Sequence, residues 1–191
     1  MDTIRLILLE DDPDFAFLVR QKISEDKQLS LEGIADNRTA GVIMAKKLQP
    51  DIALIDLNLT DGQATGIKAA HEIRTTTDTK VLLLTSVERE DMIIKAGKEA
   101  YASAYIKKSN FRTLRARIHE CAHSLTPEAL YIKTLLLSDL TDTERYVVRQ
   151  IMGEEVTCTS SPKTIANQKT SIFHKIGVKN MEELLRVLKN F

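Results

Sequence analysis

The chain has 191 residues, of which 43% are hydrophobic and 28% charged, enough apolar material for one large or two small domains of a water-soluble protein. Its 27 basic and 27 acidic residues balance, so no overall field attracts nucleic acid and any basic surface must be local. The two cysteines lack metal-site spacing, no secretory signal is evident, and no apolar run approaches the roughly 20 residues of a membrane span. These features favour a cytoplasmic protein with no membrane partner.

From Met1 to about Ser124, short apolar strands alternate with amphipathic helices. The predicted strands cover residues 5–9, 29–35, 51–56, 81–85 and 104–107. The predicted helices begin at Pro13 and, after the later strands, cover residues 37–49, 64–74, 89–100 and 110–122. This alternation through short connections predicts an α/β fold with a doubly wound, five-stranded parallel sheet.

Apolar stripes give the first two of these helices a predicted buried face. In the first helix the stripe contains Phe15, Leu18, Val19 and Ile23, with Lys22 at the same helical spacing, and in the second it contains Val42, Ile43, Ala45 and Leu48. We expect both stripes to pack against the sheet.

Beyond Ser124 no further strand is predicted. The predicted helices run from Thr126 to Leu137, from Thr141 to Met152, from Ser161 to Ile176 and from Glu182 to Leu188. A capping box, Thr141–Glu144, opens the second of them, and Gly177 ends the third. The chain therefore divides into an α/β domain at 1–124, a helical linker at 125–138 and a small all-α domain at 139–191.

Acidic residues follow two of the predicted strands. The strand at 51–56 is apolar throughout, as in the centre of a parallel sheet, and it ends in Asp56; the first strand is followed by Glu10 and Asp11. Parallel neighbours bring their carboxyl ends to the same edge of a sheet, so these acids are expected to converge. Carboxylates packed together need a cation, and a hard divalent metal ion suits them.

Polar and aromatic residues then complete a recognisable order along the chain. They are Glu10 and Asp11 after the first strand, Asp56 after the third, Thr85 after the fourth, and Tyr105 to Lys108 around the fifth. In this order and spacing, residues 1–124 resemble the receiver domain of two-component response regulators. The resemblance implies a flavodoxin-like fold and a phosphoryl group accepted on Asp56 from a sensor histidine kinase.

The resemblance also implies a Mg²⁺ site. Asp11 and Asp56 would bind the ion directly, Asn58 through its backbone carbonyl and Glu10 through water. Three acids stand in a row, so the register is open by one residue; Glu10 and Asp11 are preferred because four apolar residues precede them, with Asp12 as the alternative.

Three further residues have implied roles around the phosphoryl group. Lys108 would pair with its oxygens as a point charge, and Thr85 would donate a hydrogen bond to it. As Thr85 moves, Tyr105 would swing inward, a population shift driven by one new anion.

Residues 139–191 resemble the LuxR/FixJ-type helix-turn-helix output domain, with the segment 161–178 similar to its recognition helix. Between Val156 and Met181 there are four lysines and no acid, a charge pattern that favours contact with the phosphates of double-stranded DNA. Amide side chains in this helix can read adenine. The predicted DNA contacts are Lys163, Thr164, Asn167, Gln168 and Lys169.

One departure bears on this output. The family places a full scaffold helix before the recognition helix, but between Gly153 and Ser161 this chain has seven residues, several of them poor helix formers. The scaffold helix is therefore predicted to be shortened or replaced by a loop. Because that element positions the reading helix on DNA, the question whether the module still binds DNA stays open.

The sequence thus predicts a phosphorylation-controlled transcription regulator. Phosphorylation of Asp56 would either release the helical module or promote a homodimer. The alternative is a receiver whose degenerate helical module acts through protein–protein interaction instead of DNA. An aspartyl-phosphate enzyme is disfavoured, because that chemistry needs a second acid two residues after the nucleophile and position 58 is asparagine. We expect no enzymatic activity beyond the protein's own phosphorylation and dephosphorylation.

Overall fold

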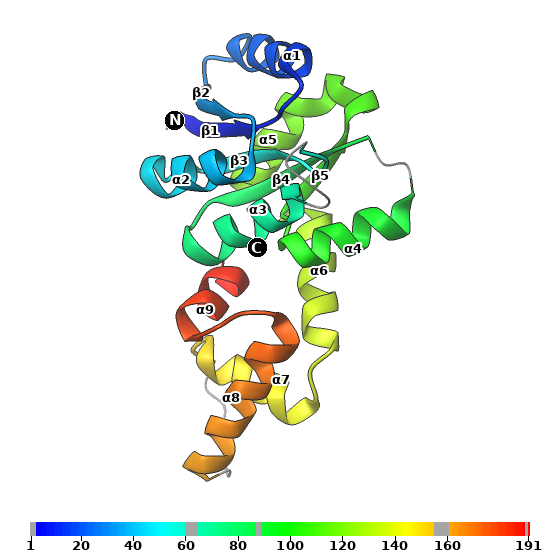
Figure 1. Ribbon diagram of the computed structural model, residues 1–191. Helices are drawn as coiled ribbons and strands as arrows, with labels where there is room; N and C mark the ends of the chain where they lie inside the picture. The colour runs from blue at the N-terminus through cyan, green and yellow to red at the C-terminus, as the bar shows by residue number, and fades with distance from the viewer. Residues whose placement is uncertain (1–2, 60–64, 87–88, 155–160, 190) are drawn as a thin grey trace.

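The computed structural model describes residues 3–59, 65–86, 89–154, 161–189 and 191. Its centre is a parallel sheet with the strand order β2-β1-β3-β4-β5 (Figure 1). The strands are β1 (Ile4–Leu9), β2 (Leu29–Ala35), β3 (Ile52–Asp56), β4 (Lys80–Thr85) and β5 (Ala104–Lys107). The chain crosses from β2 past β1 to β3, which makes the sheet doubly wound as predicted and places β3 at its centre.

Helices cover both faces of the sheet. They are α1 (Pro13–Ser24), α2 (Arg38–Leu48), α3 (Thr65–Thr76), α4 (Glu90–Ala100) and α5 (Leu114–His123), with a 3₁₀ helix η1 (Lys108–Thr113) before α5. Side chains alternate along β1, so Leu9 joins a core beneath α2, α3 and α4, whereas Leu8 joins the core beneath α1 and α5. The predicted helix at 110–122 is thus divided, since its first turn is 3₁₀ and its α-helical part begins at Leu114.

Two residues predicted to be buried lie on the surface. Leu18 of α1 is 46% exposed and Ile43 of α2 is 61% exposed. The buried side of α1 is centred on Ala16 and Val19 instead. Successive residues turn by about 100° around a helix, so a neighbour of a buried position readily faces solvent.

The described residues of the C-terminal part form the four predicted helices: α6 (Pro127–Ser138), α7 (Asp142–Ile151), α8 (Pro162–Ile176) and α9 (Met181–Lys189). They share a third core, which also contains Tyr101 from the end of α4. The α9 helix packs on α3, and α6 packs against α4 (Figure 1). The predicted linker helix therefore contributes to the core of the C-terminal module.

Hydrogen bonds join the two halves as well. The Tyr101 hydroxyl donates to the carbonyl of Ile176 (2.8 Å), and the buried Arg74 side chain donates to the carbonyls of Tyr101 (2.9 Å) and Val187 (3.3 Å). Residues 155–160, on which most of the shortened scaffold segment falls, lie outside the described residues. Among the helices that are described, none combines the length and apolar character needed to cross a membrane.

Candidate functional site

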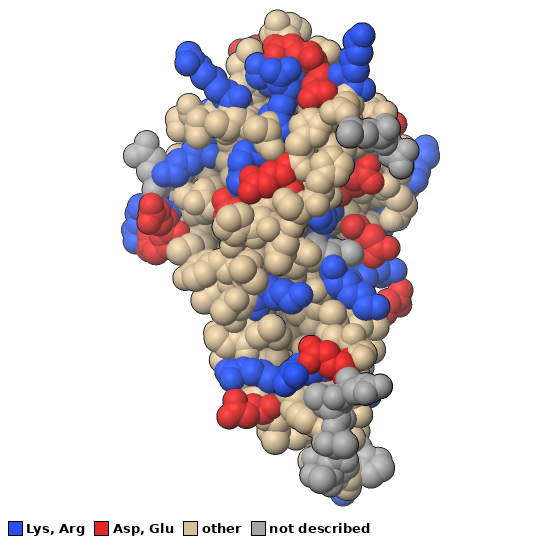
Figure 2. Space-filling model, turned by 180° about the vertical axis from the view of Figure 1, so that it is seen from behind, with Lys and Arg blue, Asp and Glu red and all other residues tan. Residues whose placement is uncertain are grey.

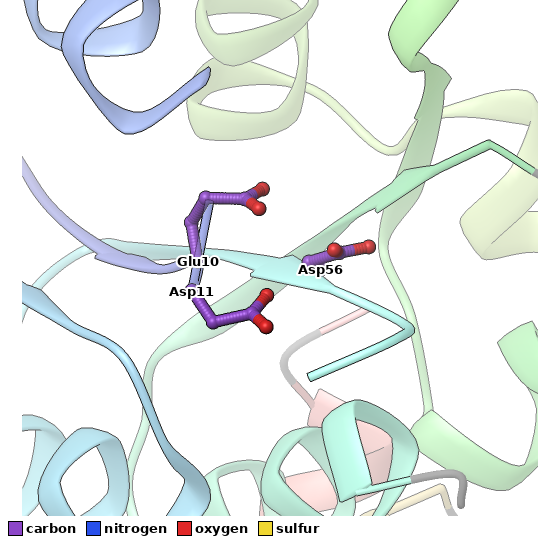
Figure 3. A group of neighbouring side chains, drawn as sticks. All are labelled: Glu10, Asp11 and Asp56. Atoms are coloured by element: carbon purple, nitrogen blue, oxygen red, sulfur yellow. The ribbon is translucent and has the colours of Figure 1, made fainter. Parts of the chain in front are cut away.

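The predicted acids meet at the carboxyl edge of the sheet. Strands β1 and β3 pair in parallel with Leu9 opposite Ile55, so Glu10 and Asp56 leave the sheet at the same level. One carboxylate oxygen from each of Glu10, Asp11 and Asp56 lies within 4.8 Å of the others, and all three side chains point into one space (Figure 3). We call these three residues the acidic cluster.

Lys108 reaches the acidic cluster from the end of β5. Its Nζ lies 2.7 Å from Glu10 Oε2 and 2.9 Å from Asp56 Oδ2. Burial raises the pKa of Glu10, and the negative charge of Asp56 raises it further. The hydrogen bond from Lys108 acts to lower this pKa but is outweighed. Burial acts to lower the pKa of Lys108, but its hydrogen bonds to Glu10 and Asp56 outweigh burial and raise that pKa. Lys108 is therefore a cation at neutral pH.

The acidic cluster fits a divalent cation. Glu10 and Asp56 are only 2% and 5% exposed, and both face the same ammonium group of Lys108, so two buried carboxylates share one positive charge. Oxygen ligands of this kind suit Mg²⁺. Asp12, the alternative in the sequence, has a different role, because its carboxylate accepts hydrogen bonds from the backbone N–H groups of Asp14 and Phe15 and caps α1.

The other predicted residues lie around the same edge. The backbone N–H of Asn58 donates to Asp56 Oδ1 (3.3 Å), so the chain turns back toward the cluster after β3. Thr85 ends β4, the strand next to β3, and is fully buried. Tyr105 pairs in register with Leu83 and packs, half-buried, against the core beneath α2, α3 and α4. The structure thus places Thr85 at this edge and Tyr105 further back along β5.

Sequence reasoning missed one neighbour of the cluster. The sequence pattern assigns Phe15 only to an apolar stripe, yet its ring lies 4.4 Å from Lys108 Nζ. The signal in the sequence is weak, since an aromatic residue in the first turn of a core-facing helix is ordinarily a packing residue.

The five predicted DNA contacts lie on α8, whose first residues are the part of the helix farthest from the sheet (Figure 1). Lys163, Thr164 and Asn167 are exposed, and Gln168 and Lys169 are half-buried. Ser161 caps the helix through a hydrogen bond from the Thr164 backbone N–H (3.2 Å).

Not every lysine of the basic stretch is available for contact with DNA. Lys175, counted in the basic stretch, forms an ion pair with Glu144 of α7 (2.7 Å) inside the module. Figure 2 shows basic and acidic side chains scattered over the face that it draws, with uncharged surface between them. The first turns of α8 are therefore a local basic feature.

Comparison with known proteins agrees with this geometry. Residues 6–119 match the response regulator receiver domain family. The transcriptional regulatory protein YdfI of Bacillus subtilis is 26% identical over 186 residues, covering 86% of this chain and 85% of that protein.

Solved structures share the fold. The receiver domain of a putative NarL from Mycobacterium tuberculosis aligns with a TM-score of 0.59 at 24% identity, over 64% of this chain and 98% of that one. RcsB from Salmonella enterica, bound to promoter rprA in the presence of the phosphomimetic BeF₃⁻, aligns over both whole chains with a TM-score of 0.56 at 20% identity. The acidic cluster and Lys108 lie within the matched residues. The chain therefore belongs to the response regulator receiver domain family.

Proposed function

We propose that this protein is a response regulator that accepts a phosphoryl group on Asp56 from a sensor histidine kinase and regulates transcription through its C-terminal helical module. The single observation that carries the proposal is the convergence of Asp56 with Glu10, Asp11 and the ammonium group of Lys108 at one edge of the sheet. Asp56 is thus a carboxylate nucleophile that already has the Lys108 ammonium group beside it.

The chemistry follows from these groups. An Asp56 carboxylate oxygen attacks the phosphorus of the kinase phosphohistidine, the P–N bond breaks, and its electron pair returns to the imidazole, which takes up a proton. Asp11, Asp56, the Asn58 carbonyl and, through water, Glu10 would hold Mg²⁺, which would supply positive charge against the charge of the phosphoryl oxygens. Lys108 then exchanges its carboxylate partners for phosphoryl oxygens, and Thr85 donates a hydrogen bond to the same group.

The output is proposed to be binding of double-stranded DNA by α8. The exposed side chains of Lys163, Thr164 and Asn167 support this, together with the description of YdfI as a transcriptional regulatory protein and of RcsB as bound to a promoter. Phosphorylation would act through the contacts between receiver and module, or through a homodimer. No catalysis beyond the protein's own phosphorylation and dephosphorylation is part of the proposal.

Binding to another protein is the second candidate for the output. The observation that favours it is the short stretch between Gly153 and Ser161, which leaves little chain for a scaffold helix. The receiver chemistry is the same in both cases.

Labelling with radioactive acetyl phosphate tests the phosphoacceptor. We expect the wild type to take up label in the presence of Mg²⁺ and to lose uptake on addition of a chelator. Asp56→Asn should abolish labelling, whereas Asp14→Asn, a change in a neighbouring acid outside the acidic cluster, should leave it intact. Equal labelling of the wild type and Asp56→Asn would refute the proposal.

A further inference from the structure

The Lys108 ammonium group has a third partner besides the two carboxylates. Its Nζ lies over the face of the Phe15 ring, 4.4 Å from the ring centroid. A cation at this distance from an aromatic face is attracted by the ring quadrupole. Glu10, Asp56 and Phe15 therefore surround the ammonium group from three elements of the fold.

One contact holds the Phe15 backbone and another holds its ring. On its own helix, the Phe15 backbone N–H donates to the capping carboxylate of Asp12 (3.2 Å), which directly follows the acids of the cluster. On the same face of the sheet, Phe111 of η1 meets the ring edge-on, with centroids 5.4 Å apart and planes at 61°. Because η1 begins at Lys108, the same short element carries both the ammonium group and the aromatic residue that braces its partner.

We infer that Phe15 is a positioning residue for Lys108 in phosphoryl transfer to Asp56; the inference rests on the proposed function. Lysine has a long flexible stem, and ordering it costs side-chain entropy. A divalent cation held by the acidic cluster would compete with Lys108 for Glu10 and Asp56. The Phe15 face is not a metal ligand, so it continues to attract the ammonium group and keeps it within reach of the incoming phosphoryl oxygens.

Substitution of the ring separates this role from packing. Phe15→Leu keeps an apolar side chain but removes the aromatic face, and we expect the maximal rate of labelling by acetyl phosphate to fall by about 3- to 10-fold. The acetyl phosphate concentration for half-maximal rate should change little, since Lys108 acts on the reacting group. Phe15→Tyr should restore the rate, and Phe111→Leu, which removes only the bracing ring, should have the smaller effect.

A double substitution decides whether Phe15 acts through Lys108. In a Lys108→Met background, Phe15→Leu should cause no further loss of rate. If Phe15→Leu lowers the rate by the same factor with and without Lys108, or if Phe15→Tyr fails to rescue, the residue is structural and the inference is wrong. Thermal unfolding of each variant, compared with the wild type, identifies any rate change that reflects loss of the fold.

A measurement without phosphodonor tests the role of Phe15 separately from the phosphorylation of Asp56. In nuclear magnetic resonance spectra of the wild type and Phe15→Tyr, the Lys108 Hε protons should be shifted upfield by the ring current, and Phe15→Leu should return them to ordinary values. Ordinary values in the wild type would overturn the inference even if Asp56 is labelled. An upfield shift in a protein that takes no label would leave the geometry intact and refute the phosphoryl-transfer role with the proposed function.

Discussion

At the scale of single residues, two buried carboxylates have opposite pKa shifts. Burial raises the pKa of Glu10 in the acidic cluster. Burial also acts to raise the pKa of Glu144 in α7, but hydrogen bonds from Lys175, Ser171 and Thr141 outweigh it and lower the pKa to about 2. Glu144 thus has its ammonium partner Lys175 and further donors within the module, whereas Glu10 shares the Lys108 ammonium group with Asp56.

The shift at Glu144 predicts a pH dependence of stability. The folded-state pKa of about 2 lies below the unfolded value of 4.5, so the stabilisation is fully present above pH 4.5 and is lost as pH falls toward 2. Glu144→Gln should lower the free energy of unfolding at pH 7 by about 1–3 kcal/mol and flatten the acid limb. Urea unfolding between pH 3 and 7 measures this, with the exposed Glu182→Gln as control. Parallel pH curves for Glu144→Gln and the wild type would contradict the assignment.

At the scale of elements, α8 is the part of the fold to which the DNA-binding proposal applies. Lys163 and Lys169 lie in its first half, and Lys175 in its second half is held by Glu144. The double change Lys163→Ala and Lys169→Ala should weaken DNA binding and reduce the slope of log affinity against log salt by about 1 for each phosphate that is no longer neutralised. Fluorescence anisotropy over a salt series checks this, with Lys189→Ala on α9 as the matched control. Equal slopes for all three proteins would favour the protein-binding alternative.

Most elements of the fold could be predicted from the sequence. Apolar periodicity defines the strands, and caps such as Asn37 and Ser161 define helix starts, because both signals are local in the chain. The acidic cluster was predictable for the same reason, since strand ends determine where Glu10 and Asp56 emerge. The contact of Phe15 with Lys108 was not predictable, because it depends on how α1 and η1, far apart in the sequence, pack together on one face of the sheet.

At the scale of the whole molecule, the receiver supplies hydrogen-bond donors to the C-terminal ends of two helices of the module. The hydroxyl of Tyr101 binds the Ile176 carbonyl at the end of α8, and Arg74 binds the Val187 carbonyl near the end of α9. Helix C-termini carry unpaired carbonyls and partial negative charge, so donors there are stabilising. Burial of the Arg74 guanidinium lowers its pKa to about 10, which leaves it charged at neutral pH.

Tyr101 is the residue at which this coupling can be tested. Its side chain belongs to the third core. A Cβ added to Gly177 would stand 3.1 Å from the Tyr101 hydroxyl, so glycine at position 177 permits the hydroxyl to approach the Ile176 carbonyl. The Tyr101 backbone itself has φ +51°, which Phe can retain as well as Tyr does.

We therefore expect Tyr101→Phe to keep the core packing but to release one end of α8 from the receiver. Amide hydrogen exchange should become faster in α8 and α9 by about 5- to 10-fold, as the loss of one buried hydrogen bond of about 1 kcal/mol implies, and should stay unchanged in β1 and β3. Tyr131→Phe, a change on the exposed side of α6, is the matched control and should alter neither region. Faster exchange throughout the sheet would show that the hydroxyl stabilises the receiver itself. Unchanged exchange in α8 would show that the Tyr101 hydroxyl does not hold this helix to the receiver. The predicted pattern would identify the Tyr101 hydroxyl as a direct link between the receiver domain and α8.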